Sequence, residues 1–73
     1  MLDLNFRDCN WVLLHTERVD NATMDDRQIF QLENDLLKDH PDTACISTLE
    51  YTRDPKRPGG GWDCVGIDQR WIV

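Results

Sequence analysis

The chain has 73 residues, with 14 acidic and 8 basic side chains and a formal net charge of −6. A domain this small buries only about 60% of the surface that its unfolded chain exposes, which leaves little room for a deep, water-excluding pocket. The negative charge argues against nucleic acid as a direct ligand, because phosphate recognition needs clustered cations. It favours solubility and partners with basic surfaces.

The first part of the chain predicts two strands. Residues 2–7 alternate between apolar and polar side chains, which is typical of a strand with one buried face. Residues 8–10 have turn-forming side chains. Residues 11–19 predict a second strand that is apolar on both faces near its start. Together these segments predict a hairpin.

A helix is predicted from Met24 to Asp39, with Thr23 as its N-cap. The pair His40 and Pro41 should end it, because the residue before a proline disfavours helical conformation. Apolar side chains recur at helical spacing and predict one buried stripe, formed by Ile29, Leu32 and Leu36 and widened by Phe30 and Leu37.

Two more strands are predicted after the helix. Residues 44–53 are rich in β-branched and aromatic side chains. Residues 62–68 form the next strand, whose continuation to Val73 stays open, and Gly66 is a candidate for a bend or bulge. The order ββαββ predicts an α+β fold in a single domain, residues 1–73. A mainly antiparallel sheet of four strands, with the helix on one face, buries all the apolar stripes.

Acidic side chains are concentrated on the predicted helix. The two in its last turns oppose the helix dipole, which hints that the acidic face is kept for recognition. A solvated face without a role is the alternative. The candidate partner-binding acids are Asp25, Asp26, Glu33, Asp35 and Asp39.

The loop at residues 54–61 is the basic exception in this acidic chain. Hairpin loops usually have two to five residues, so this one is long. The loop is predicted either to project as a basic segment that binds an acidic patch or phosphates, or only to connect the two strands of the hairpin. The candidate partner-binding residues here are Arg53, Lys56, Arg57 and Trp62.

Three tryptophans, Trp11, Trp62 and Trp71, are many for so short a chain. One helix covers one sheet face, so a tryptophan on the other face would be exposed unless a partner covered it. Tryptophan is also a common interface hot spot. Burial in the core is nevertheless the expectation for each of them, and the three cysteines are likewise expected to be small buried hydrophobic residues.

No catalytic residue, metal site or cofactor is predicted. Ser47 has no nucleophile-elbow context, and Gly59–Gly61 lacks the Gly-Lys-Ser/Thr ending of a phosphate loop. A metal set can be drawn from Cys9, His15, His40 and Cys45, but its spacing differs from the paired-cysteine knuckle of zinc sites.

The N-terminal residues lack the basic and apolar regions of a signal peptide, and no apolar stretch is long enough to span a membrane. A cytoplasmic location without membrane association is therefore expected.

In size, charge and element order, the whole chain resembles the small acidic proteins that bacteriophages make to disable host machinery. It is most similar in format to the inhibitors that bind host RNA polymerase, although no motif is diagnostic. The resemblance implies a non-enzymatic, monomeric inhibitor of transcription in the host bacterial cytoplasm. Such a protein would place its acidic helix on a basic surface used by nucleic acid or σ, or pair the strand at residues 62–73 with its target.

Two alternative functions stay open. One is a nucleic-acid mimic that acts as an anti-CRISPR or anti-restriction protein, which has the same format. The other is a weak nucleic-acid-binding module that uses the basic loop, with Trp62 stacking on a base.

Overall fold

The structure is a computed structural model that describes residues 1–53, 56, 59 and 61–72, apart from the side chain of Ile67. The described elements follow the predicted order ββαββ, and the α+β fold is confirmed. Their bounds are β1 (Leu2–Arg7), β2 (Leu13–Val19), α1 (Asp26–Asp39), β3 (Cys45–Arg53) and β4 (Trp62–Trp71).

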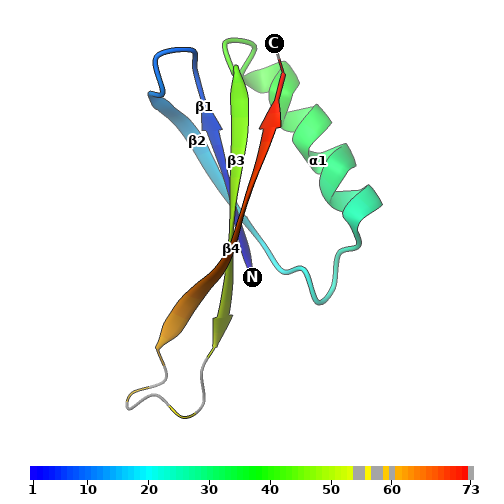
Figure 1. Cartoon of the computed structure of the whole chain (residues 1–73). Coiled ribbons are helices and arrows are strands. Elements are labelled where there is room, and N and C mark those ends of the chain that lie inside the picture. The colour runs from blue at the N-terminus through cyan, green and yellow to red at the C-terminus, as the bar shows by residue number, and fades with distance from the viewer. Residues whose placement is uncertain (54–55, 57–58, 60, 73) are drawn as a thin grey trace.

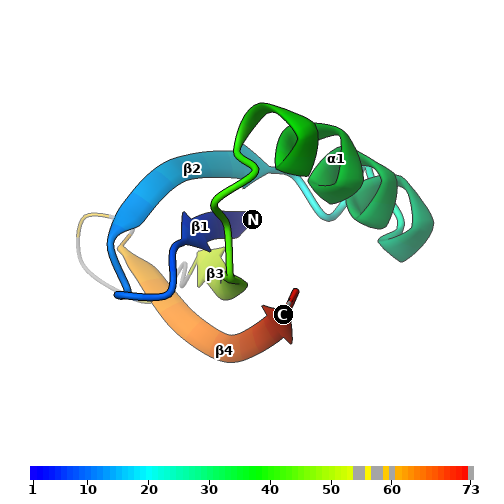
Figure 2. The ribbon, with the colours of Figure 1, turned by 90° about the horizontal axis from the view of Figure 1, so that it is seen from above.

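The strands form one sheet in the order β2-β1-β3-β4, and every neighbouring pair is antiparallel. β2 and β4 are therefore the edge strands. The helix lies on one side of this twisted sheet, as predicted (Figures 1 and 2). The ends of β3 and β4 that lead into the loop at residues 54–61 extend well beyond the helix (Figure 1).

The core lies between the helix and one face of the sheet. Leu4, Phe6 and Ile46 have no exposed surface, and Ile29 of the helix is 7% exposed. Because successive side chains of a strand point to opposite faces, the alternation in β1 puts all its apolar side chains on this side. The partly buried residues that complete the core are Leu2, Met24, Leu32, Leu36 and Leu37. The predicted stripe is thus confirmed except for Phe30, which is 50% exposed.

The helix begins later than predicted, and Thr23 is not its cap. Asp25 is the N-cap: its side chain accepts a hydrogen bond from the backbone N–H of Gln28 at 2.8 Å, and the Gln28 side chain accepts one from the backbone N–H of Asp25 at 3.0 Å. Thr23 instead donates its hydroxyl to the Asp20 carbonyl at 3.1 Å. Two reciprocal bonds satisfy more free N–H groups than one hydroxyl does, which favours the capping box. The predicted end at Asp39 is confirmed.

The turn between β1 and β2 holds Trp11 in an uncommon conformation. Its φ angle is 66°, in the left-handed region that bulky residues rarely adopt. The Asp8 carboxylate accepts hydrogen bonds from the backbone N–H groups of Asn10 and Val12, each at 2.9 Å, and Arg7 donates to the Trp11 carbonyl at 3.0 Å. This conformation is why β2 begins at Leu13 and not at Trp11 as predicted.

The predicted irregularity at Gly66 is confirmed as a bulge. Glu50 of β3 lies opposite Gly66, whereas the next residue, Tyr51, lies opposite Cys64. Val65 is therefore an extra residue in β4. The bulge keeps Tyr51 and Cys64 on the same face of the sheet and bends the hairpin formed by β3 and β4.

Leu4 and Leu13 provide a matched test of this packing, because Leu4 is fully buried and Leu13 is 48% exposed on the opposite face. Leu4→Ala should lower the free energy of unfolding by about 2–5 kcal/mol, since it leaves a cavity in the core. Leu13→Ala removes the same atoms and should cost less than about 1 kcal/mol. Urea denaturation followed by circular dichroism measures both, and equal losses would contradict this assignment of the two faces.

Candidate interaction surface

The strand register defines an uncovered face, the side of the sheet opposite the helix. Residues directly across from each other in the sheet share a face, so the pairings in all four strands assign each side chain. Charge is divided between the two faces. The strand residues Asp3, Arg7, Arg18 and Arg53 lie on the uncovered face, and Glu17, Glu50, Asp63, Asp68 and Arg70 lie on the helix side.

One end of the uncovered face carries a cluster that we call the tryptophan patch: Arg7, Trp11, Leu13 and Trp71. The ring centroids of Trp11 and Trp71 are 6.1 Å apart, and the Arg7 guanidinium carbon lies 5.2 Å from the Trp11 ring centroid. Trp11 is 43% exposed and Trp71 is 62% exposed. These side chains come from β1, the following turn, β2 and β4, so only the folded sheet brings them together.

Cys45 lies under the tryptophan patch. By register it is on the uncovered face, opposite both Arg7 and Trp71, yet none of its surface is exposed. Burial raises the pKa of the Cys45 thiol. The expected burial of cysteines is confirmed for Cys45 but wrong for Cys9 and Cys64, which are exposed. Cys9 lies in the turn between β1 and β2, and Cys64 lies in β4 on the uncovered face.

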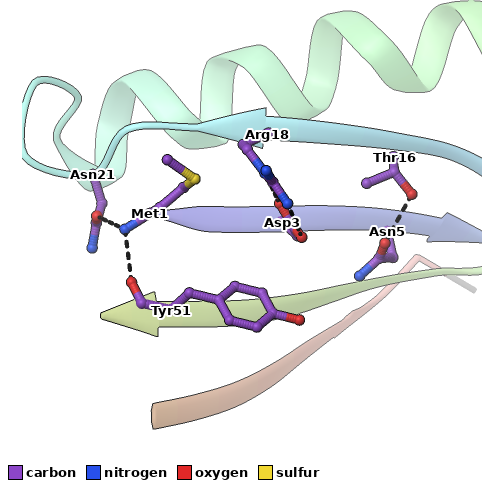
Figure 3. A network of polar contacts seen from close by, with 7 residues as sticks. All are labelled: Met1, Asp3, Asn5, Thr16, Arg18, Asn21 and Tyr51. Atoms are coloured by element: carbon purple, nitrogen blue, oxygen red, sulfur yellow. Dashed lines mark hydrogen bonds and ion pairs between the residues drawn. The ribbon is translucent and has the colours of Figure 1, made fainter. Parts of the chain in front are cut away.

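The other end of the uncovered face holds the Tyr51 pocket, about 260 Å³ in volume and lined by Met1, Asp3, Arg18, Tyr51 and Trp62. Arg18 donates two hydrogen bonds to Asp3, at 2.8 and 3.2 Å, and these bonds lower the pKa of the Asp3 carboxyl. The Met1 ammonium donates to the Asn21 side chain at 2.8 Å and to the Tyr51 carbonyl at 3.0 Å (Figure 3). The floor of this pocket is therefore fixed by charge-assisted bonds.

Polar side chains lie on β1 and β2 next to this pocket. The Thr16 hydroxyl donates to the Asn5 side-chain oxygen at 2.9 Å, two residues along each strand from Asp3 and Arg18 and on the same face (Figure 3). A sheet face that packs in a protein's own core rarely carries a polar pair such as Thr16 and Asn5, because buried polar groups cost free energy to desolvate.

The predicted acidic helix face is only partly present. Asp25, Asp26, Asp35 and Asp39 are exposed, but Glu33 is buried and does not belong to an exposed acidic face. The side of the helix opposite the core carries Arg27, Gln31 and Lys38, which share one face by helical spacing. The acids lie on two flanks of this face. Asp25 and Asp26 also have structural roles, as the N-cap and in the first turn.

Glu33 fixes the helix to β4. Its carboxylate lies 3.7 Å from Arg70, which also donates to the Asn34 side chain at 3.0 Å and lies 4.2 Å from the Phe30 ring centroid. Burial raises the pKa of Glu33, and the Arg70 charge opposes that shift. Sequence reasoning missed Arg70. The available signal was that Glu33, four residues after Ile29, falls within the buried stripe and needs a partner.

The structure brings two of the predicted loop residues together. Arg53 and Trp62 lie directly opposite each other at the ends of β3 and β4, and both are exposed. Lys56 is an exposed turn residue. Arg57 and most of the loop at residues 54–61 lie outside the described residues. The expectation that each tryptophan is buried in the core was wrong for all three.

The residues considered as metal ligands do not form one site. The rings of His15 and His40 stack with centroids 4.9 Å apart, on the helix side, whereas Cys45 lies on the uncovered face. Among the described residues, no group of three or more histidine, cysteine or acidic side chains is arranged to hold a metal ion.

No protein-family model matches the chain, and comparisons with curated proteins and with solved structures find no similar protein. In the part of the chain that the structure describes, no helix is long and apolar enough to cross a membrane.

Glu33→Gln should change how stability depends on pH. Because the pKa of Glu33 is raised above 4.5 in the folded chain, its contribution to stability is largest at low pH and is lost as the pH rises from about that value toward the raised one. The free energy of unfolding of the wild type should therefore fall, relative to Glu33→Gln, between about pH 4 and about pH 7.

Urea denaturation at both pH values measures this difference. Leu32→Ala serves as the control, because it weakens the packing of the same helix on the core without removing a titrating group and should lower stability equally at both pH values. A constant difference between the wild type and Glu33→Gln would contradict the assignment of Glu33 to the buried contact.

Proposed function

We propose that the chain is a non-enzymatic regulator that binds a large protein target through the tryptophan patch. The observation that carries this proposal is that Trp11 and Trp71, brought together from distant parts of the chain, lie side by side on a sheet face that no other described element covers. Tryptophan and arginine are the residues most enriched in interface hot spots.

The turn that carries Trp11 is held by hydrogen bonds within the chain itself. Trp11 is held in its left-handed conformation by the Asp8 hydrogen bonds and by Arg7. Strain of this kind costs of order 1–3 kcal/mol and tends to be kept where a side chain must be presented to a ligand. A side chain that is already ordered loses less entropy on binding, which strengthens affinity.

The expected target is host RNA polymerase in the bacterial cytoplasm, on the strength of the resemblance to phage inhibitors. Of the two mechanisms considered, pairing through an edge strand is the better supported, because β4 is an edge strand and carries Trp71. A target segment added beside β4 would lie next to the tryptophan patch. Docking through the helix is less well supported, and so is nucleic-acid mimicry, because the helix acids lie on two flanks.

A binding assay with purified bacterial RNA polymerase tests this proposal. Trp71→Ala should weaken binding at least tenfold, as expected for a hot spot. The matched control is the double variant Asp35→Lys with Asp39→Lys, which reverses two exposed helix charges and should change affinity less than about twofold if the patch is the contact surface.

Circular dichroism would verify that each variant is folded. The opposite pattern, in which the helix variant loses binding and Trp71→Ala retains it, would overturn the tryptophan patch in favour of acidic docking. Failure of the wild type to bind the polymerase would overturn the proposed target.

A further inference from the structure

We propose that the Tyr51 pocket is a binding site for single-stranded nucleic acid, in which a base stacks against Tyr51 and Trp62 while its phosphates contact Arg18 and Arg53. The inference is independent of the proposed function, except that both sites lie on the uncovered face. The tryptophan patch is at one end of that face and the Tyr51 pocket is at the other.

Charge on the uncovered face favours a polyanion, although the whole chain is acidic. Among the described strand residues, three of the four arginines lie on this face, and only one of the five acids, Asp3, accompanies them. The Met1 ammonium adds a further positive charge in the pocket. The other acidic strand residues lie on the helix side, across the sheet.

The Asp3 carboxylate does not cancel this preference, because it orients Arg18. Its two oxygens accept one bond each from Nε and Nη2, which fixes the plane of the guanidinium group. A guanidinium group has five N–H donors, so three stay available for phosphate oxygens or a base edge. The Arg18 side chain is 65% exposed and thus accessible to a ligand.

The aromatic walls of the pocket favour a base. Trp62 is 49% exposed, and Tyr51 lies beside the Asp3–Arg18 ion pair (Figure 3). The volume of about 260 Å³ is just below the range of about 300–1,000 Å³ that is usual for small-molecule sites, so the pocket suits one planar group. Stacking of bases on exposed aromatic side chains is the usual way in which sheet surfaces hold single strands.

The geometry also explains why the strand must be single. Bases in a duplex are already stacked on one another, and their faces are not available to Trp62 or Tyr51. Arg53 lies directly opposite Trp62 at the ends of β3 and β4, and so is placed to meet the backbone of a strand whose base stacks on that ring.

Fluorescence anisotropy with a labelled oligothymidine of about 12 nucleotides tests the inference, since single-strand sites cover about 4–16 nucleotides. The chain is used without an N-terminal tag so that the Met1 ammonium is free to make the contacts described. At about 50 mM salt the wild type should bind the single strand and bind a duplex of equal length at least tenfold more weakly. With two phosphate contacts, log affinity should fall with log salt with a slope of about −1.4.

Trp62→Ala should weaken binding at least fivefold and Trp62→Phe should restore most of the loss, because phenylalanine keeps a stacking face. Arg18→Gln should weaken binding and reduce the salt slope. Trp71→Ala, at the other end of the face, is the matched control and should bind the oligonucleotide like the wild type.

Equal affinity for duplex and single strand, no binding at low salt, or full binding by folded Trp62→Ala would each overturn the inference. Binding of nuclease-treated RNA polymerase, measured with the same variants, keeps this outcome separate from the proposed function. That binding should be weakened at least tenfold in Trp71→Ala and kept in Trp62→Ala.

Discussion

The structure depends on one constraint: a single 14-residue helix has to bury the apolar side of a four-stranded sheet. It does so by packing Ile29 and its neighbours on Leu4, Phe6 and Ile46, and Arg70 with Glu33 ties β4 to the helix. Nothing else in the described chain is available to cover the opposite face. That face is therefore free to carry the aromatic and basic side chains that a core would exclude.

The two ends of the uncovered face carry different kinds of side chain. The tryptophan patch is apolar with one arginine, lies over the buried Cys45 and is held by a strained turn, which suits a protein contact. The Tyr51 pocket is polar, positive and lined by aromatic rings, which suits single-stranded nucleic acid. A regulator of a nucleic-acid-handling enzyme has use for both, because such an enzyme presents protein surface and unpaired strands close together.

Local sequence signals predicted the helix and strands well, but they predicted poorly which face of the sheet each side chain occupies. Alternation in β1, the helical stripe and Gly66 are local features, so the element order, the helix end and the bulge were predictable. Which face Trp62 or Trp71 occupies depends on pairing between distant strands and on the bulge. The same holds for charge: the net value of −6 argued against nucleic acid, but only the register shows that three strand arginines lie on the face opposite most of the strand acids. The buried partner of Glu33 is likewise a long-range contact, with Arg70.

The most direct test of the uncovered face is ¹⁹F NMR of the chain labelled with 5-fluorotryptophan, with the three signals assigned by single Trp→Phe variants. The shift of each signal between H₂O and D₂O reports solvent contact of that indole. Trp11, Trp62 and Trp71 should all show clear solvent shifts, since each is at least 43% exposed. Signals without a solvent shift would place the indoles in the core and contradict a sheet whose second face is uncovered.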